Sequence, residues 1–273
     1  MACAELKKMK LPEGNPNHTN NKRVLVVGGG MSGLTVALET AEAGYEVVIV
    51  EKSAQLSGWA AKLWKRVPFK APYAEPQDTG VADLANKVSS HPHITVHLNS
   101  SVAETAGAPG RFSIKVAQES GTITTEEVGA IVQASGFSTY DINKLPELGG
   151  GKSAHVIDQA GLEALAMQAN GGAIKRADGK EVKSVVFVQC AGQRDDSGKH
   201  LPYCSGHCCA TSVKQAMYFK DANPQVDTVV MYTDLRLPGM GEDFYRSAQH
   251  KGMTFTKGKV SAVDHRCAQP SAG

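Results

Sequence analysis

The chain has 273 residues and a mass of 28.9 kDa, enough for one large domain or two smaller ones with separate cores. Hydrophobic residues make up 41% and charged residues 21% of it, and the formal net charge is +2, so nothing points to a nucleic-acid partner. It contains no apolar run of roughly 18 to 20 residues, and its start lacks the apolar core of a secretory signal, so we expect a cytoplasmic protein.

The first elements predict a strand, a tight turn, a helix and a second strand. Residues 1–21 are polar and rich in proline and asparagine, which indicates a short helix followed by a linker. The apolar run Val24–Val27 precedes three glycines, a helical stretch over 32–43, and the apolar run Val47–Val50. This is one βαβ unit, and it implies a parallel sheet.

The rest of the chain alternates between helical and strand patterns. Residues 54–76 predict irregular structure packed against a flat surface, because Trp, Tyr and Phe occur there among Pro, Gly and basic residues. Later segments predict helices over 81–90, 211–219 and 244–249, strands over 93–98, 130–134, 184–190 and 227–232, and a hairpin of 112–116 with 121–125.

These elements predict an α/β protein with two units. We expect a Rossmann-like domain, with part of a second α/β unit that carries a cysteine cluster. The predicted division is an N-terminal helix and linker over 1–21, the first domain over 22–150, the second unit over 151–265 and a tail over 266–273.

The glycine-rich turn has the spacing of a dinucleotide fingerprint. Gly28 permits the tight turn, Gly30 lets the backbone approach a pyrophosphate, and Gly33 lets helix and strand pack closely. Glu51 closes the second strand, where a carboxylate accepts hydrogen bonds from ribose hydroxyls and repels a 2′-phosphate. The pattern therefore favours a dinucleotide whose adenosine lacks that phosphate.

Two further segments favour FAD over NAD. The stretch that begins with Lys52 and contains Gly58 resembles the loop of two-dinucleotide-domain flavoproteins that passes over the FAD pyrophosphate and flavin. The segment VQASGF, which includes Ala134 and Gly136, resembles the second short motif of the same proteins, where the glycine allows close approach to the cofactor. We therefore expect the Rossmann-like domain over 22–150 to be a FAD-binding domain of the two-dinucleotide-binding flavoprotein type.

Cysteines are concentrated in one region. Four of the six cysteines form the pattern C-x13-C-x3-C-C: Cys190, Cys204, Cys208 and Cys209. Four soft ligands suit a tetrahedral metal ion or an iron–sulfur cubane, and two adjacent cysteines favour the larger body of a cubane. A zinc site, buried free thiols and a redox disulfide such as Cys204 with Cys208 remain alternatives, and His207 between the candidates is interpreted as a loop residue.

Four segments together resemble a known family. GGGMSG, LSGWAAKLWKRVPFKAPY, VFVQCAGQRD and PYCSGHCCATSVKQA are similar to the A-type flavoprotein subunits of heterodisulfide reductases, and closer still to related subunits of the quinone-interacting membrane-bound oxidoreductase complex. The similarity covers about Lys22 to Val260. It implies that the four cysteines ligate a [4Fe-4S] cluster, and that FAD lies along Gly28, Gly30, Ser32, Gly33, Glu51, Lys52, Gly58, Val102, Ala134 and Gly136.

The resemblance also implies a role and partners. It implies a FAD and [4Fe-4S] oxidoreductase subunit that passes electrons between flavin, cluster and partner subunits of such a complex, and reaches a membrane only through those partners. The second unit has CAGQRDDSG where a nicotinamide-binding domain would carry its own glycine fingerprint, which argues against direct NAD(P)H oxidation. Arg194, Asp195 and Asp196 are candidates to order the loop between Cys190 and Cys204, and a solvated turn is an equal alternative.

Two other functions remain open at this point. One is an NAD(P)H-dependent FAD disulfide reductase whose cysteines act as redox thiols, and the other is a non-catalytic assembly subunit held by zinc. Family members return to the FAD domain after the second unit, whereas this sequence ends in VDHRCAQPSAG, so we expect a fragment or one product of a split gene.

Overall fold

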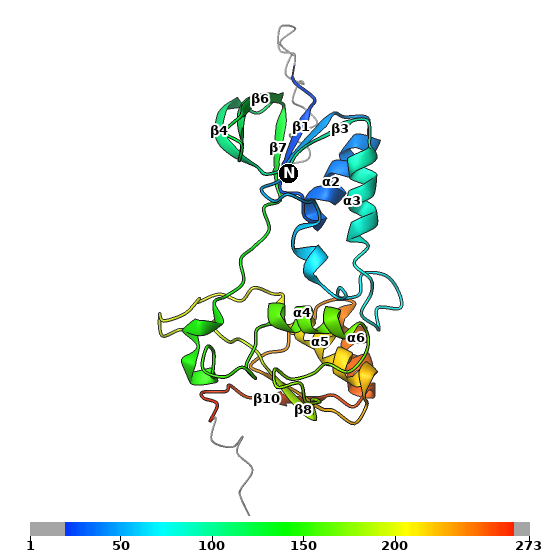
Figure 1. The fold of residues 1–273 in the computed structure, drawn as a ribbon, viewed down its shortest axis with the longest axis vertical. Coiled ribbons are helices and arrows are strands. Elements are labelled where there is room, and N and C mark those ends of the chain that lie inside the picture. Colours follow the sequence, from blue (N-terminus) through cyan, green and yellow to red (C-terminus); the bar gives the residue numbers. More distant parts are fainter. Residues whose placement is uncertain (1–19, 265–273) are drawn as a thin grey trace, which may run out of the picture. The chain divides into compact units, whose positions relative to one another are not determined.

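The computed structural model describes residues 20–264, which form two compact units (Figure 1). Of the described residues, unit 1 comprises 20–58 and 83–136, and unit 2 comprises 59–82 and 137–264. The predicted boundary at residue 150 differs from this division, since residues 59–82 and 137–150 pack within unit 2. The predicted N-terminal helix and the tail over 266–273, which carries Cys267, lie outside the described residues.

Unit 1 is built on a parallel sheet of four strands in the order β3-β2-β1-β7. The strands are β1 Val24–Val27, β2 Val47–Val50, β3 Ile94–His97 and β7 Ala130–Gln133. Two helices, α2 Met31–Glu42 and α3 Val81–Ser90, connect β1 to β2 and β2 to β3. β1 and β2 are apolar throughout because both faces of a parallel sheet are covered.

A three-stranded antiparallel sheet covers the face of the parallel sheet opposite α2 (Figure 1). Its strands are β4 Ser100–Ala108, β5 Arg111–Gln118 and β6 Ile123–Val128. The core between the two sheets consists of Leu25, Val48, Val50, Ile114, Val116 and Val128. Since this sheet returns the chain to β7 beside β1, it reverses the direction in which strands are added to the parallel sheet.

Unit 2 repeats the arrangement of β1 to β3 with a second parallel sheet, in the order β10-β9-β8. The strands are β8 Ser184–Val188, β9 Asp227–Tyr232 and β10 Thr254–Lys257. The helices are α4 Gln159–Ala169, α5 Cys208–Ala222 and α6 Gly241–His250, with short 3-10 helices η1 Gly58–Lys62, η2 Ile142–Lys144 and η3 Pro146–Leu148. α5 lies at the centre of the core, where Val213, Ala216 and Met217 are fully buried.

Most predicted elements agree with the structure, and a few differ. The helix predicted over 211–219 begins at Cys208, so two of the candidate cysteines lie on its first turn. The sequence pattern does not predict β4 or β10, since β4 is mostly exposed and lacks apolar alternation, and β10 has four residues. It does not predict α4 either, although Asp158 caps this helix by accepting a hydrogen bond from Gly161 N at 2.7 Å.

A buried ionic network holds the segment after η1 against α4 and α5. Glu163 Oε1 accepts hydrogen bonds from Lys214 Nζ and Gln215 Nε2, both at 2.8 Å, and Glu163 Oε2 accepts one from Trp64 N at 2.9 Å. Lys214 Nζ also donates to Lys65 O at 2.7 Å. Burial lowers the pKa of Lys214, and the Glu163 charge opposes that change. The ion pair thus helps to position the irregular segment, together with the Tyr218 hydroxyl, which bonds to Lys65 N and Lys65 O.

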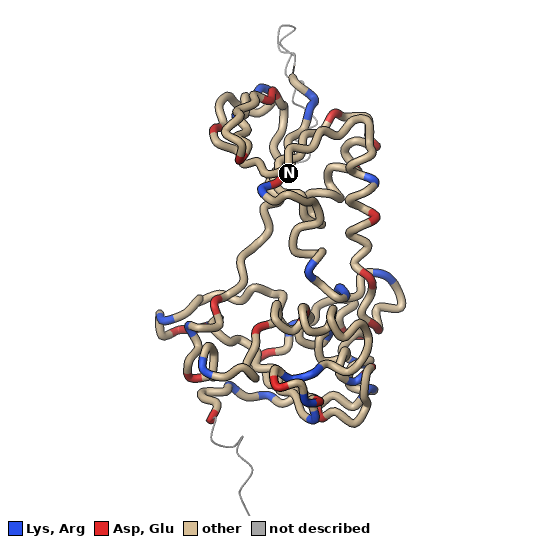
Figure 2. The backbone as a smooth tube through the Cα atoms, viewed as in Figure 1, with Lys and Arg blue, Asp and Glu red and all other residues tan. Residues whose placement is uncertain are grey.

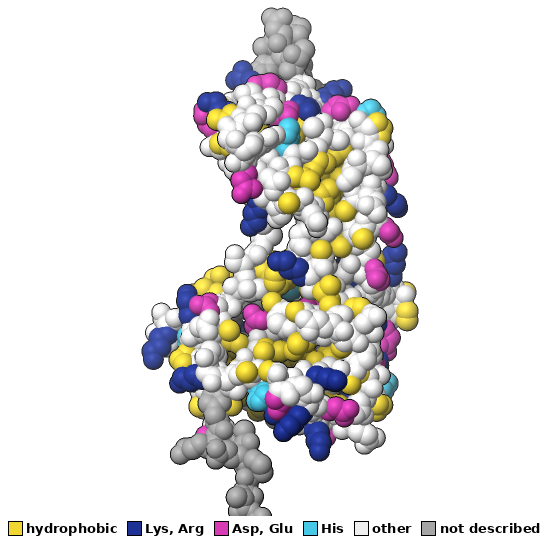
Figure 3. All heavy atoms as spheres, viewed as in Figure 1, with side chains coloured by type: hydrophobic (Ala, Val, Ile, Leu, Met, Phe, Trp, Pro, Cys, Tyr) yellow, Lys and Arg dark blue, Asp and Glu magenta, His cyan; other side chains and the backbone are white. Residues whose placement is uncertain are grey.

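Charges of both signs are interspersed over the two units (Figure 2), and apolar side chains lie among them on the face drawn in Figure 3. Within residues 20–264, no helix combines the length and the apolar character needed to span a bilayer.

We predict that Lys214→Met lowers the free energy of unfolding by about 3–5 kcal/mol, because it leaves the Glu163 carboxylate buried without its cation. Denaturant unfolding of the full chain measures this, with the exposed Lys183→Met as the matched control. Adding Glu163→Gln to Lys214→Met should restore part of the loss, since a neutral amide is less costly to bury. Equal stability of Lys214→Met and the control would contradict the role of the pair.

Candidate functional site

The turn between β1 and α2 is closed too tightly for side chains. Gly28 N donates to Val50 O at 2.8 Å, and the φ of Gly28 is +108°. A Cβ on Gly28 would overlap the carbonyl oxygen of Ala134, and a Cβ on Gly33 would overlap that of Gly28. The structure therefore gives Gly28 and Gly33 the steric roles that the fingerprint predicts.

The amino end of α2 is open. Gly30 is the N-cap of this 12-residue helix, no described side chain caps it, and its first turn carries no acidic residue. A Cβ on Gly30 would meet nothing within 4 Å, and Ser32 is exposed in the same turn. Backbone N–H groups and the positive end of the helix dipole thus face free space, an arrangement that suits a pyrophosphate.

Glu51 lies beside this turn at the end of β2 and is 5% exposed. Its Oε2 accepts a hydrogen bond from Gly29 N at 2.6 Å, and its Oε1 accepts one from Ser53 N at 2.8 Å. Each carboxylate oxygen can accept a second hydrogen bond, so the group retains capacity for ribose hydroxyls. Glu51 therefore positions the turn and fits the predicted ribose contact.

The loop after Glu51 lies across the glycine turn. Ser57 N donates to Gly29 O at 2.8 Å, and Ser57 forms a bridge with Gly30. Gly58 has a φ of +54°, and a Cβ there would lie 3.0 Å from the Gly30 Cα. Gly58 thus lies beside the glycine turn, whereas the Lys52 side chain is exposed, and the contacts of both residues with FAD stay predictions.

The segment after β7 completes this edge of unit 1. Ala134 N donates to Val27 O at 2.8 Å, which places Ala134 against Gly28, and Gly136 has a φ of +74° with free space around it. β1 and β7 are neighbours reached by opposite connections, so the site lies at the topological switch point at the carboxyl ends of the strands. Val102 lies in β4, where its side chain packs on the core, and its place along FAD stays a prediction.

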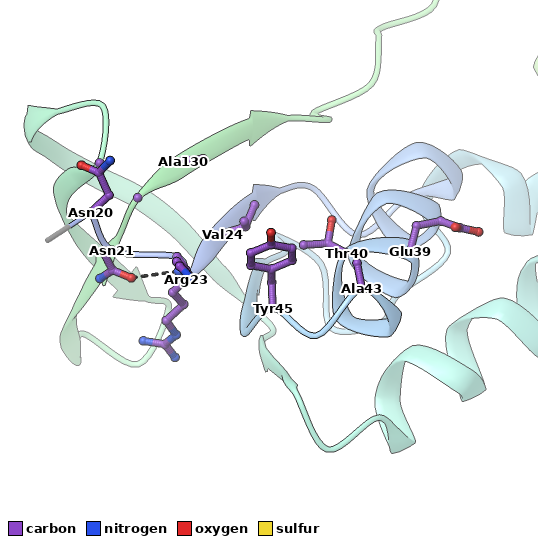
Figure 4. A pocket seen from close by; sticks show the side chains of 12 residues that line it. Asn20, Asn21, Arg23, Val24, Glu39, Thr40, Ala43, Tyr45 and Ala130 are labelled. Carbon is purple, nitrogen blue, oxygen red and sulfur yellow. Dashed lines mark hydrogen bonds between the residues drawn. The ribbon is translucent and has the colours of Figure 1, made fainter. Parts of the chain in front are cut away.

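A shallow pocket of unit 1 lies at the other ends of these strands (Figure 4). Val24 and Ala130, the first residues of β1 and β7, line it together with Thr40, Tyr45 and Arg23. Since dinucleotides bind at the carboxyl ends of such strands, this pocket is not the site that the glycines form.

In unit 2 the cysteines take the topological place that the glycine turn has in unit 1. Cys190 follows β8 with a φ of +59°, and Cys204 lies in the loop that leads to α5. Cys208 and Cys209 begin α5. The carboxyl end of the first strand and the amino end of the first helix therefore carry thiols instead of glycines.

The four thiols are free, and Cys190, Cys204 and Cys208 all influence the pKa of Cys209. A hydrogen bond from Cys208 lowers the pKa of Cys209 to about 7, while burial and the charges of Cys190 and Cys204 oppose that shift. The same hydrogen bond raises the pKa of Cys208. Within residues 20–264, no three His, Cys, Asp or Glu side chains are arranged to hold a single metal ion. Four soft sulfur donors around the start of α5 suit the chemistry of an iron–sulfur cluster.

Polar side chains order the loop between Cys190 and Cys204. Asp195 Oδ2 accepts hydrogen bonds from Ser197 Oγ at 2.7 Å and from His200 N at 3.0 Å, and these lower the pKa of Asp195 to about 2. The Tyr140 hydroxyl and His200 Nδ1 lie 2.6 Å apart, and the Tyr140 ring covers Gly192. Asp195 thus acts as predicted, whereas Tyr140 lacks any local sequence signal because it lies far away in the chain.

An aromatic group lies next to the cysteine loop in unit 2. The rings of Trp59 and Phe137 are 5.9 Å apart in an edge-to-face arrangement, and the rings of Phe137 and His207 are 6.3 Å apart. Phe137 is 64% exposed, so the group offers an apolar surface. His207, interpreted as a loop residue, immediately precedes Cys208 and is the N-cap of α5.

Comparisons with known proteins agree with this description. A family profile described as an NAD(P)-binding Rossmann-like domain matches residues 26–68. The chain is 28% identical to the second A-type iron-sulfur subunit of the CoB–CoM heterodisulfide reductase of Methanopyrus kandleri, over 88% of this chain and 48% of that protein. It is 26% identical to the A-type subunit of the ferredoxin/F420H2-dependent CoB-CoM heterodisulfide reductase of Methanosarcina acetivorans, over 90% of this chain and 41% of that protein.

The chain thus spans less than half the length of these two relatives. Among solved structures, thioredoxin reductase of T. acidophilum is 12% identical with a TM-score of 0.46, over 86% of this chain and 64% of that one. The predicted resemblance to the A-type subunits of heterodisulfide reductases and the predicted Rossmann-like fold are confirmed.

The glycine turn gives a prediction about stability. Gly28→Ala should lower the midpoint of thermal unfolding strongly, because the new Cβ meets the Ala134 carbonyl and the backbone has a positive φ. Gly30→Ala should change the free energy of unfolding by less than about 1 kcal/mol, since free space surrounds it and its φ is ordinary. Calorimetry of both variants checks the contrast, and equal destabilisation would contradict the described turn.

Proposed function

We propose that the chain is a FAD-dependent oxidoreductase subunit that carries a [4Fe-4S] cluster and transfers electrons within a heterodisulfide reductase-like complex. The observation that carries this proposal is that two similar α/β units have different chemical groups where the first strand meets the first helix. Unit 1 offers backbone donors at the open end of α2, and unit 2 offers four thiols around the start of α5.

The residues of unit 1 would bind and orient the dinucleotide. The first turn of α2 would hold the pyrophosphate, with Gly30 leaving room for its approach, and Glu51 would accept hydrogen bonds from the ribose. The residues Gly58 and Gly136 would allow the cofactor to pass close to the backbone. A carboxylate beside the ribose favours an adenosine without a 2′-phosphate.

The residues of unit 2 would hold the cluster through Cys190, Cys204, Cys208 and Cys209. When bound, the flavin would supply two-electron chemistry and the cluster single-electron chemistry. Burial of Cys209 and the ordered loop around Asp195 would limit the access of water to the thiolates. The protein would position the cofactors, donate hydrogen bonds to them and limit the access of water, because the cofactors themselves would supply the redox chemistry.

The names of the relatives support a role inside a larger assembly. They are called subunits of heterodisulfide reductases, and one name contains the words iron-sulfur subunit. We therefore propose partner subunits of the heterodisulfide reductase or quinone-interacting type, a cytoplasmic location, and membrane association only through those partners.

The composition of the anaerobically purified protein tests this proposal. We expect flavin absorption together with a broad iron–sulfur shoulder, and about four irons and four sulfides per chain, as a cubane requires. Flavin without iron would favour the disulfide reductase alternative, and zinc without flavin would favour an assembly subunit. Either result would overturn the electron-transfer function.

The ligand set gives a second prediction. Replacing any one of Cys190, Cys204, Cys208 and Cys209 by Ser should strongly reduce the iron retained per chain, because thiolates are the preferred ligands of these clusters. Cys3→Ser and Cys267→Ser are the matched controls and should retain iron like the unsubstituted protein. Iron loss in a control, or full iron retention in all four variants, would contradict the assignment.

The free space at Gly30 gives a third prediction. Gly30→Ala should weaken FAD binding at least tenfold while the protein stays folded, since the added methyl group occupies the approach to the start of α2. Fluorescence titration of the deflavinated protein with FAD measures this, and Gly258→Ala, at another site with an ordinary φ, is the control. Unchanged affinity in Gly30→Ala would place the pyrophosphate elsewhere.

A further inference from the structure

Arg194 lies in the loop between Cys190 and Cys204, and its side chain reaches the loop after β9. Its Nη2 donates to Asp234 Oδ2 at 2.7 Å, and its backbone N donates to Tyr203 O at 3.1 Å, next to Cys204. The φ of Arg194 is +54°, which is unusual for a residue with a side chain. The guanidinium is therefore held in one place by both its side chain and its backbone.

The guanidinium of Arg194 also lies beside a cysteine. The hydrogen bond to Asp234 raises the pKa of Arg194, and the nearby Cys190 thiol acts in the same direction. Its Nη1 is buried and has no hydrogen-bond partner among the described residues. A group that is always positively charged thus keeps an unused donor next to a candidate ligand.

Gln189, the residue before Cys190 in the chain, carries a second buried donor without a partner. It is 7% exposed, and its Nε2 has no partner among residues 20–264. Leaving such a buried donor unpaired costs about 1–3 kcal/mol. Three buried side-chain atoms lack a partner in the described part of the chain. Two of them belong to residues within four positions of Cys190 in the sequence, and the third, Gln215 Oε1, belongs to the Glu163 network.

Asp234 connects this arrangement to the cysteines on α5. Its carboxylate binds Arg194, and its backbone oxygen lies 3.8 Å from Cys209 Sγ, which donates to it. One residue at the carboxyl end of β9 therefore fixes the guanidinium and contacts a second candidate ligand. This makes Asp234 a positioning residue.

We propose that Arg194 and Gln189 donate N–H···S hydrogen bonds to the bound cluster or its thiolates, and that Arg194, positioned by Asp234, raises the reduction potential of the cluster. The inference rests on the proposed function. Reduction adds negative charge to the cluster, so a fixed positive charge and hydrogen bonds to sulfur stabilise the reduced form more than the oxidised form. The pairing partner for both unused donors is then the cluster itself.

Redox titration followed by electron paramagnetic resonance tests this inference on the anaerobically purified full chain. Arg194→Gln should lower the midpoint potential by an amount that corresponds to at least a tenfold change in the one-electron equilibrium, about 59 mV. Asp234→Asn should lower it less, and Arg194→Lys should restore part of the shift. Arg176→Gln removes a similar Arg–Asp pair with 2.8 Å between Arg176 Nη2 and Asp178 Oδ2, and should leave the potential unchanged.

Gln189→Leu keeps the charge and removes only the uncharged donor. It should lower the potential by less than Arg194→Gln does. Transfer of the protein into D₂O shifts the Fe–S stretching frequencies when N–H groups bond to sulfur, and this shift should be smaller in Gln189→Leu. If Arg194→Gln loses its iron, Gln189→Leu and Asp234→Asn decide the question. Unchanged potentials in the iron-loaded variants would overturn the inference alone, whereas an unsubstituted protein without iron would overturn the proposed function and the inference with it.

Discussion

The turn from β1 into α2 has no room for a side chain at Gly28, and the rest of unit 1 depends on that constraint. Because the Gly28 backbone passes directly under the Ala134 carbonyl, β7 can lie beside β1, and α2 can start close to the sheet edge. The same tight path leaves the first N–H groups of α2 without side-chain caps. A sequence constraint on backbone geometry thus becomes a constraint on chemistry, since only an anionic group or water can satisfy those donors.

Unit 2 uses the same frame for different chemistry. Its first strand and first helix meet at the corresponding edge of a parallel sheet, but Cys190 and the pair that begins α5 replace the glycines. Thiolates at the positive end of a helix are favoured for the same reason as a phosphate, because the helix dipole stabilises negative charge there. Arg194 adds a further positive group at this edge, so electrostatics that would hold a pyrophosphate in one unit would hold an anionic cluster in the other.

The sequence predicts the parts of this structure that rest on local constraints. The strands and helix between Val24 and Val50 follow from glycine spacing and apolar runs, and their bounds agree within one residue. Elements without a local pattern escape prediction: β4 is largely exposed and is fixed by pairing with β5, not by its own residues. The sequence places the start of α5 too late because Cys, Ser and His are weak helix formers, and only the packing of α5 in the core extends the helix to Cys208. Asp234 escapes prediction for a related reason, since its link to Arg194 joins two loops forty residues apart.

The segment that leaves the dinucleotide loop at Gly58 belongs to the unit that carries the cysteines. Trp64 N and Lys65 O are held by Glu163 and Lys214, and Lys214 lies on α5, little more than one turn after Cys209. An apolar core could fill the same space with equal stability, but it would not fix the register of an irregular segment against a helix, whereas directional bonds to a buried ion pair do so. A displacement of the whole of α5 would therefore disturb the Lys65 contact as well, because the Lys214 Nζ donates to Glu163 and to the Lys65 carbonyl at once. The buried charge pair thereby couples the path of the chain beyond the dinucleotide loop to the position of the cysteine helix.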